Sequence, residues 1–258
     1  MKVKKLFGNL FKWEPQKITI TGLLLGLIMV ALSVALIYLP EGILTLIIIR
    51  DLLMILLCGI GIPLFIINKE KDLHGYGLHL KKWYLFLPVN LLLGFLLLLV
   101  FLKESPLPAS FSFTGDLVWK IVFLMLAGIF EMITFYSFIR TAIERSLGII
   151  PAILIAAIFY SLHHAGFQPE FGKLLFVGIL YATVFRIGNS ALLIYPFFWG
   201  VGGCYDVLVQ SQEASEIVYP ELRSVILLIG IGLVLIYLKL SVSKTTDLPR
   251  SSDNFSKS

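Results

Sequence analysis

Residues 83–102 have the sequence WYLFLPVNLLLGFLLLLVFL, a run of 20 residues without a single charged side chain. An α-helix needs about 20 mostly apolar residues to cross the hydrocarbon core of a bilayer. Seven further apolar runs occupy residues 18–39, 42–67, 117–139, 149–165, 172–186, 190–210 and 223–241. The sequence therefore predicts an all-α, polytopic transmembrane bundle of about eight helices. The run at 172–186 is shorter than a usual span, which leaves seven crossings as the alternative.

The composition of the whole chain agrees with a membrane protein. Of its 258 residues, 58% are hydrophobic and only 14% are charged, whereas about a quarter of the residues of a soluble domain are charged. We expect a single transmembrane domain at residues 18–241. A basic cytoplasmic segment at residues 1–17 precedes it, and a disordered cytoplasmic tail rich in Ser, Asp and Lys follows at residues 242–258.

The formal net charge of +5 has a topological explanation. Cytoplasmic loops of membrane proteins carry an excess of Lys and Arg. If the N-terminus lies inside, 16 of the 21 Lys and Arg residues fall in segments that the eight predicted spans place in the cytoplasm. The pattern predicts a multi-pass protein of the cell membrane with both termini cytoplasmic, and it removes the reason to expect a nucleic-acid partner. The bilayer itself is the first expected partner.

Ionisable side chains inside spans are costly, so each is a hypothesis about function. They occur at five places: Arg50 with Asp51, Lys120, Glu131, His163 with His164, and Asp206. Arg50 and Asp51 point about 100° apart on a helix, which predicts that they pair with other helices and have a structural role. Lys120 lies near a span end and can reach the interface.

Glu131 and His163 are the candidate catalytic pair. Glu131 lies in the apolar stretch LMLAGIFEMITFYSF at 124–138, where a buried carboxylate can act as a general base or make a helix-packing hydrogen bond. His163 lies one helical turn after Phe159. Both candidates are about 21 Å from the cytoplasmic ends of their helices, so they could meet. Because successive residues of a helix cannot face one site, only one of His163 and His164 is expected there.

The spacing of these residues resembles a known family. The Glu131 helix, the Phe159-x-x-x-His163 helix about 30 residues later and a further polar-interrupted helix resemble the CAAX-protease and bacteriocin-processing (CPBP, or Abi) intramembrane endopeptidases, over about residues 117–210. The resemblance implies a bacterial membrane hydrolase on a bundle of about eight helices. It also implies that Glu131 and His163 activate a water that cleaves a membrane-associated peptide or protein.

The chain departs from the family pattern at two motifs. The family's first motif is Glu-Glu-x-x-x-Arg, and here Met132 and Tyr136 stand in place of its second Glu and its Arg. The family's third motif begins with a His, but no His follows His164, and the corresponding region offers Phe198, Trp199 or Gly200. Loss of one oxyanion donor lowers rates by about 10²- to 10³-fold. A non-catalytic relative that acts as an immunity, assembly or binding factor is therefore the alternative.

Two further expectations follow from the polar residues. A catalytic zinc usually has three protein ligands, and Glu131 with one His leaves only Asp206 as a third, so we predict no metal and no other cofactor. The remaining alternative is a small transporter subunit whose path is lined by Arg50, Asp51, Glu131 and Asp206. The sequence lacks the inverted repeats of many transporters, which ranks this alternative last.

Overall fold

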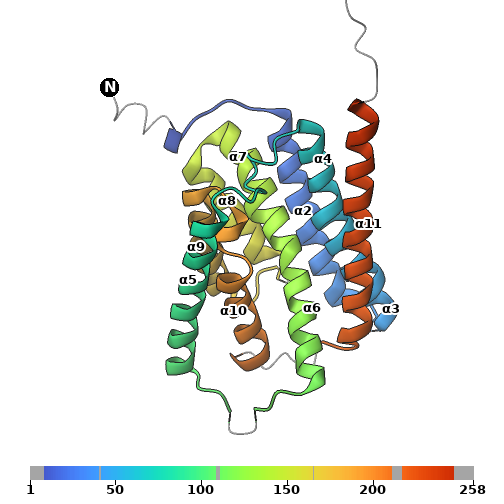
Figure 1. Cartoon of the computed structure of the whole chain (residues 1–258), viewed down its shortest axis with the longest axis vertical. Helices are drawn as coiled ribbons and strands as arrows, with labels where there is room; N and C mark the ends of the chain where they lie inside the picture. Colours follow the sequence, from blue (N-terminus) through green and yellow to red (C-terminus); the bar gives the residue numbers. More distant parts are fainter. Residues whose placement is uncertain (1–8, 41, 109–110, 165, 211–216, 247–258) are drawn as a thin grey trace, which may run out of the picture.

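The computed structural model describes residues 9–40, 42–108, 111–164, 166–210 and 217–246, and within these ranges every regular element is a helix. The predicted all-α bundle is confirmed (Figure 1). In chain order the elements are α2 (Lys17–Tyr38), α3 (Ile43–Thr45), η1 (Leu46–Gly61), α4 (Ile62–Glu70), α5 (Trp83–Glu104), α6 (Gly115–Glu131), η2 (Met132–Ile139), α7 (Arg140–Leu147), α8 (Ile149–Leu162), α9 (Phe171–Gly188), η3 (Ala191–Leu193), α10 (Phe197–Tyr205), η4 (Asp206–Gln210) and α11 (Pro220–Thr246).

Six of the helical segments in the described part of the chain are long and apolar enough to cross a membrane, so the chain is a membrane protein. They are Lys17–Tyr38, Ile43–Glu70, Trp83–Glu104, Gly115–Leu147, Phe171–Gly188 and Pro220–Leu240. The predicted short run at 172–186 is 18 residues long in the structure and is one of the six. The short helices are instead α8, with 14 residues, and α10 with η4, because α8 ends at Leu162 and residues 191–196 form the 3-10 helix η3 and a turn before Phe197.

The first and last described parts of the chain lie at the same end of the bundle. Figure 1 shows the start of α2 and the last turn of α11 at the same end, opposite the connection between α5 and α6. This arrangement agrees with an even number of passages through the bundle. Helix α11 continues past the predicted boundary at 241 to Thr246, since each residue added to an existing helix gains a backbone hydrogen bond. Residues 1–8 of the predicted N-terminal segment and residues 247–258 of the predicted tail lie outside the described residues.

The segment formed by α6, η2 and α7 is the centre of the bundle. It is the most buried of the six candidate spans, and all eight residues of η2 are buried. Its neighbours include α2, α8, α10 and α11. Thr114 begins this segment as the N-cap of α6, where its hydroxyl accepts a hydrogen bond from the Leu117 N–H at 3.2 Å. Glu131 is thus carried on the most enclosed helix of the protein.

Three of the described segments are π-helical, and two of them, η1 and η2, lie against each other. Most π-helices are single-turn bulges that occur often at functional sites, but η1 contains 16 residues. Thr134 on η2 donates to the Gly59 carbonyl of η1 at 2.5 Å, and Ser137 donates to the Tyr76 carbonyl at 2.6 Å. Glu131 is the last α-helical residue before η2. The carboxylate therefore lies where the pitch of the helix changes.

A buried ion pair joins η1 to α11. The Arg223 guanidinium donates from Nε and Nη2 to the two Asp51 carboxylate oxygens, each at 2.7 Å, and both side chains are 0% exposed. The prediction that Asp51 pairs with another helix is confirmed. The Arg50 guanidinium lies 5.7 Å from the Phe123 ring centroid. Lys120 forms an ion pair with Asp116, one turn closer to the start of α6.

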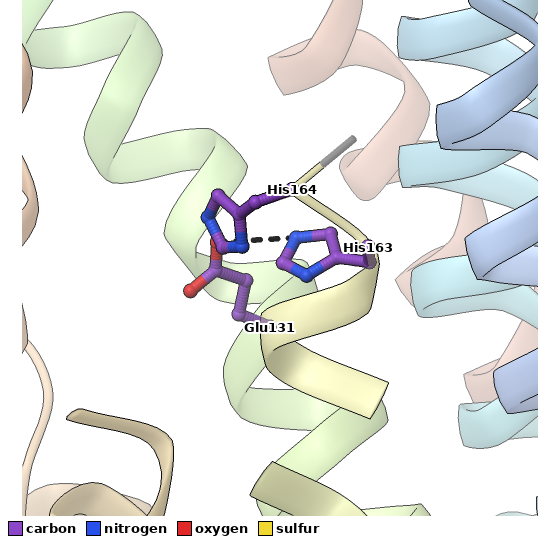
Figure 2. Close-up of side chains that lie close together, drawn as sticks. All are labelled: Glu131, His163 and His164. Carbon is purple, nitrogen blue, oxygen red and sulfur yellow. Dashed lines mark ion pairs between the residues drawn. The ribbon is translucent and has the colours of Figure 1, made fainter. Parts of the chain in front are cut away.

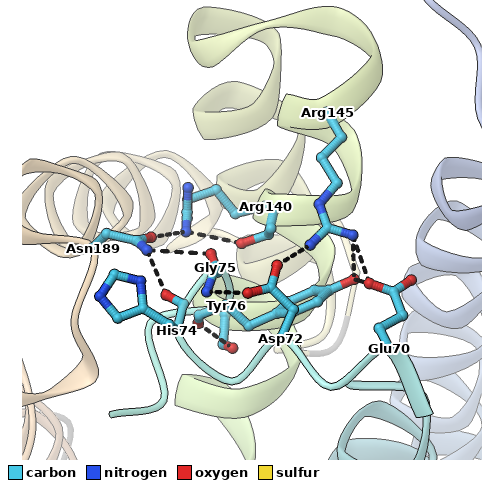
Figure 3. A network of polar contacts seen from close by, with 10 residues as sticks. Glu70, Asp72, His74, Gly75, Tyr76, Arg140, Arg145 and Asn189 are labelled. Carbon is cyan, nitrogen blue, oxygen red and sulfur yellow. Dashed lines mark hydrogen bonds and ion pairs between the residues drawn. The ribbon is translucent and has the colours of Figure 1, made fainter. Parts of the chain in front are cut away.

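A polar network closes the end of the bundle at which the chain begins (Figure 3). Arg145 on α7 donates to Glu70 at 2.6 Å and to Asp72 at 2.9 Å, and its guanidinium lies 4.5 Å from the Tyr76 ring centroid. The Tyr76 hydroxyl donates to Glu70 at 2.9 Å, and burial raises the pKa of Tyr76. The network ties the loop at residues 71–82 to the end of the central segment.

The same network reaches α9. Asn189 follows α9 in the left-handed conformation, with a φ of 45°. Its side chain accepts from Arg140 at 3.1 Å and donates to the His74 carbonyl at 2.9 Å. Glu144 binds both Arg140 and Arg186. Charge-assisted hydrogen bonds therefore hold together the end of α7, the end of α9 and the start of the loop at residues 71–82.

Candidate functional site

Three ionisable side chains from two helices meet inside the bundle. Figure 2 shows Glu131 facing His163 and His164 across the gap between α6 and the end of α8. The Glu131 Oε1 atom lies 3.6 Å from His163 Nε2 and 3.8 Å from His164 Nε2. The prediction that Glu131 and His163 lie at the same depth and can meet is therefore confirmed.

The expectation that only one histidine faces this site is wrong. It assumed that both residues are inside a helix, but α8 ends at Leu162, His163 is its C-cap, and His164 lies beyond it. Past a helix end, the 100° rotation per residue no longer applies. Gly166, with a φ of 75°, donates from its N–H to the Leu162 carbonyl at 2.7 Å. A glycine shortly after the histidines was the available signal that the helix stops there.

Hydrogen bonds to the backbone fix the orientation of both imidazoles. The Nδ1 atoms of His163 and His164 lie 2.5 and 2.9 Å from the Tyr160 carbonyl oxygen. A carbonyl only accepts, so each Nδ1 carries the hydrogen and each Nε2 faces Glu131. The Ser33 hydroxyl on α2 donates to the His163 carbonyl and holds the end of α8 in place. The rings are therefore positioned before any ligand arrives.

Aromatic side chains enclose one side of the site. The rings of Phe130, Phe135 and Tyr160 lie 4.6 to 5.6 Å from the His163 ring. The side chains of His163 and Glu131 are 5% and 8% exposed, whereas that of His164 is 33% exposed. Access to the carboxylate is consequently on the His164 side.

Trp199 on α10 binds the other oxygen of the carboxylate. Its indole Nε1 donates to Glu131 Oε2 at 2.8 Å. Gly128 makes this approach possible, because a Cβ there would overlap the Trp199 ring. The sequence leaves open whether Tyr136 or Tyr205 replaces the missing oxyanion donor of the third motif, and Tyr136 is buried in η2. Tyr205 instead donates to the Ser105 carbonyl at 2.5 Å.

Arg50 and Asp206, two further ionisable residues of the spans, are not among the three side chains that meet at this site. Arg50 lies close enough to act electrostatically on Glu131 and on both histidines. Asp206 forms an ion pair with Lys173 at 2.5 Å. The third ionisable group beside Glu131 and His163 is thus His164 and not Asp206.

An apolar groove lies next to α10. It has a volume of about 590 Å³, and its walls come from α5, α6, α10, η4 and the segment after α5. Met125 and Gly200 line it, and they belong to the helices that carry Glu131 and Trp199. An apolar chain in the groove would therefore lie beside the helix that contacts the carboxylate.

The cluster has the donor set of a metal site or of a water-activating pair. Ligand atoms from Glu131, His163 and His164 all lie within 4.8 Å of one another. No family model, curated protein or solved structure matches the chain. The expectation of no metal rested on a single histidine beside Glu131, and His164 now provides the third ligand that a catalytic zinc usually has.

Proposed function

We propose that the chain is an intramembrane endopeptidase of the CAAX-protease and bacteriocin-processing type, located in a bacterial cell membrane with both termini in the cytoplasm. Its substrate would be a membrane-associated peptide or protein. The observation that carries the proposal is the approach of Glu131 Oε1 to His163 Nε2 at 3.6 Å in a buried site. This distance is too long for a direct hydrogen bond and allows one water to contact both atoms.

The proposed reaction uses that water as the nucleophile. His163 Nε2 accepts a hydrogen bond from the water and orients it, because its Nδ1 is committed to the Tyr160 carbonyl. Glu131 takes the proton while the water oxygen bonds to the carbonyl carbon of the peptide. The protonated Glu131 then gives the proton to the amide nitrogen as the C–N bond breaks. Trp199 holds the carboxylate during both transfers.

The apolar groove supports the proposed substrate class. Its lining is almost entirely apolar, and α5 and α6 on its walls belong to candidate membrane spans. A tethered or membrane-inserted segment could occupy it while the polar backbone to be cleaved lies toward α10. Soluble peptides without an apolar segment are expected to be poor substrates.

The test is cleavage of a library of membrane peptides by the purified protein in liposomes. Wild type is compared with Glu131→Gln and His163→Ala, and His79→Ala in the loop at 71–82 is the matched control. We expect cleavage to fall by about 10²-fold or more in both site variants, as for loss of a general base, and to persist in the control. A folded wild type that cleaves no member of the library, or a Glu131→Gln variant that retains full cleavage, contradicts the proposal.

A non-catalytic relative that binds a membrane peptide is the second candidate. It is favoured by the Trp199 hydrogen bond, which occupies one carboxylate oxygen, and by the absence of a histidine after His164 in the sequence. This candidate is selected if the protein binds a membrane peptide without cleaving it and Glu131→Gln binds the peptide equally well. A transporter subunit is favoured least, because Asp51 and Asp206 are paired with Arg223 and Lys173.

A further inference from the structure

We infer that Glu131, His163 and His164 form a binding site for one divalent transition-metal ion of the zinc type. The inference concerns the site of the proposed function, and it rests on that function only for the role of a bound water. Metal binding itself needs no peptide cleavage. Two imidazoles and one carboxylate are a recurrent ligand set of catalytic zinc.

The spacing of the ligand atoms suits such an ion. Bonds of 2.0 to 2.2 Å in a tetrahedral arrangement place two ligand atoms about 3.4 Å apart. The Glu131 Oε1 atom lies 3.6 and 3.8 Å from the two Nε2 atoms. All the ligand atoms of the cluster lie within 4.8 Å of one another.

The orientation of the rings gives an independent argument. Both Nδ1 atoms face the Tyr160 carbonyl, so both Nε2 atoms present lone pairs. These lone pairs point at a carboxylate oxygen, which is also an acceptor. A cation between them removes the repulsion. Helix capping alone would explain the contacts of Nδ1 with a free carbonyl at the end of α8, but it would not explain why both Nε2 atoms face Glu131.

The groups behind the ligands match those of known metal sites. Histidine ligands usually donate their other ring N–H to a carbonyl or carboxylate, and ligating carboxylates are themselves hydrogen-bonded. Here the Tyr160 carbonyl and the Trp199 indole have these roles. Trp199 occupies Oε2 and leaves Oε1 for an ion. The exposed side of His164 leaves room for a water as the fourth ligand.

The types of the ligand atoms narrow the kind of ion that can bind. Calcium and magnesium prefer several oxygen ligands, whereas imidazole nitrogen favours zinc and its neighbours among the transition metals. We therefore expect Zn²⁺, and Co²⁺ as its spectroscopic substitute, to bind in preference to Mg²⁺ or Ca²⁺.

The experiment uses the other two histidines to isolate the site. The chain contains four histidines, and His74 and His79 stack on each other in the loop at 71–82 with their ring centroids 4.3 Å apart. The starting protein carries His74→Ala and His79→Ala, so that only the site imidazoles remain. Purified in detergent, it is titrated with Co²⁺ and followed by its visible absorption, and bound zinc is measured by elemental analysis.

We expect about one ion per chain, with absorption typical of a four-coordinate site. Affinity should fall at least 10-fold in Glu131→Gln, His163→Ala and His164→Ala, and by about 10- to 100-fold in Trp199→Phe. Thermal unfolding of each variant checks its fold, and His164→Gln replaces His164→Ala if the alanine variant is unfolded. Failure to bind a stoichiometric ion, or unchanged binding in a folded His164 variant, overturns the inference.

The outcomes separate this inference from the proposed peptidase. If the protein binds the ion at these residues but cleaves no peptide, the inferred metal site stands and the proposed peptidase is rejected. If wild type cleaves the peptides and Glu131→Gln does not, but no stoichiometric ion binds, the peptidase stands and the metal site is rejected.

Discussion

At the scale of single residues, buried charged side chains determine which substitutions the protein can tolerate. Asp51 and Arg223 are both 0% exposed and bind through two hydrogen bonds. The Arg223 guanidinium also lies 4.2 Å from the Phe123 ring centroid. Removing one partner of such a pair leaves the other charge without compensation, whereas removing both is far less damaging.

We therefore predict that Asp51→Asn lowers the free energy of unfolding by about 3–5 kcal/mol. The double variant Asp51→Leu with Arg223→Leu should recover most of this loss. Unfolding by heat or by denaturing detergent measures both. The control is Asp116→Asn, which removes the largely exposed partner of Lys120. The pair has no special role if Asp51→Asn is no less stable than the control.

The candidate site could be predicted only in part, for reasons that lie in particular residues. Glu131 and His163 were identifiable because a carboxylate and an imidazole are rare in apolar spans. His164 was excluded by assuming that the helix continued past it. Trp199 was named only as one of three residues in the region of the missing third motif. An indole in an apolar helix is ordinary, and its contact with Glu131 depends on how α10 packs on α6.

At the scale of elements, close helix packing depends on missing side chains. Gly128 on α6 lies directly under the Trp199 ring, and a Cβ at this position would overlap it. By contrast, a Cβ at Gly172 on α9 meets nothing within 4 Å. The two glycines provide a matched test and control. Alanine at Gly128 overpacks a helix interface, whereas alanine at Gly172 extends into open space.

Gly128→Ala should displace the indole and lengthen its hydrogen bond to Glu131. We expect a loss of stability of about 1–3 kcal/mol, as for other overpacked sites. The emission of Trp199 should also change in a protein whose Trp13, Trp83 and Trp119 are replaced by Phe. Gly172→Ala should show neither effect. Unchanged Trp199 emission in Gly128→Ala would contradict the packing described for α6 and α10.

Helix lengths were harder to predict than helix number. The apolar run at 149–165 continues through the histidines, so hydropathy alone could not place the end of α8 at Leu162. Likewise, the run at 190–210 includes residues that form turns before α10 begins at Phe197. In both cases the backbone hydrogen bonds of the native packing, and not the apolar character of the side chains, decide where the helix stops.

At the scale of the whole molecule, the arrangement of loops predicts a labelling pattern. The loop at 71–82 lies at the end of the bundle where the chain begins, and the segment after α5 lies at the other end (Figure 1). The excess of Lys and Arg favours the first end as cytoplasmic. Cys58 and Cys204 are free cysteines, so replacing both by Ala gives a background for single labels.

In that background, a membrane-impermeant maleimide added to intact cells should label Glu104→Cys. It should label Lys81→Cys only after the membrane is permeabilised. Labelling of both variants from the same side would contradict the passage of α5 through the membrane. The reverse pattern would retain that passage and contradict the cytoplasmic placement of the termini.

The shortness of α8 has a consequence for the surrounding lipid. Its 14 residues extend about 21 Å, against about 30 Å for the hydrocarbon core. Where a hydrophobic helix is shorter than the hydrocarbon core, local thinning of the bilayer is one response, at an energy that increases with the mismatch. His163 and His164 follow directly after this helix, so the water that reaches them would come through the compressed region. The chemistry of the site would then depend on the thickness of the host membrane, with short-chain lipids favouring hydration of Glu131.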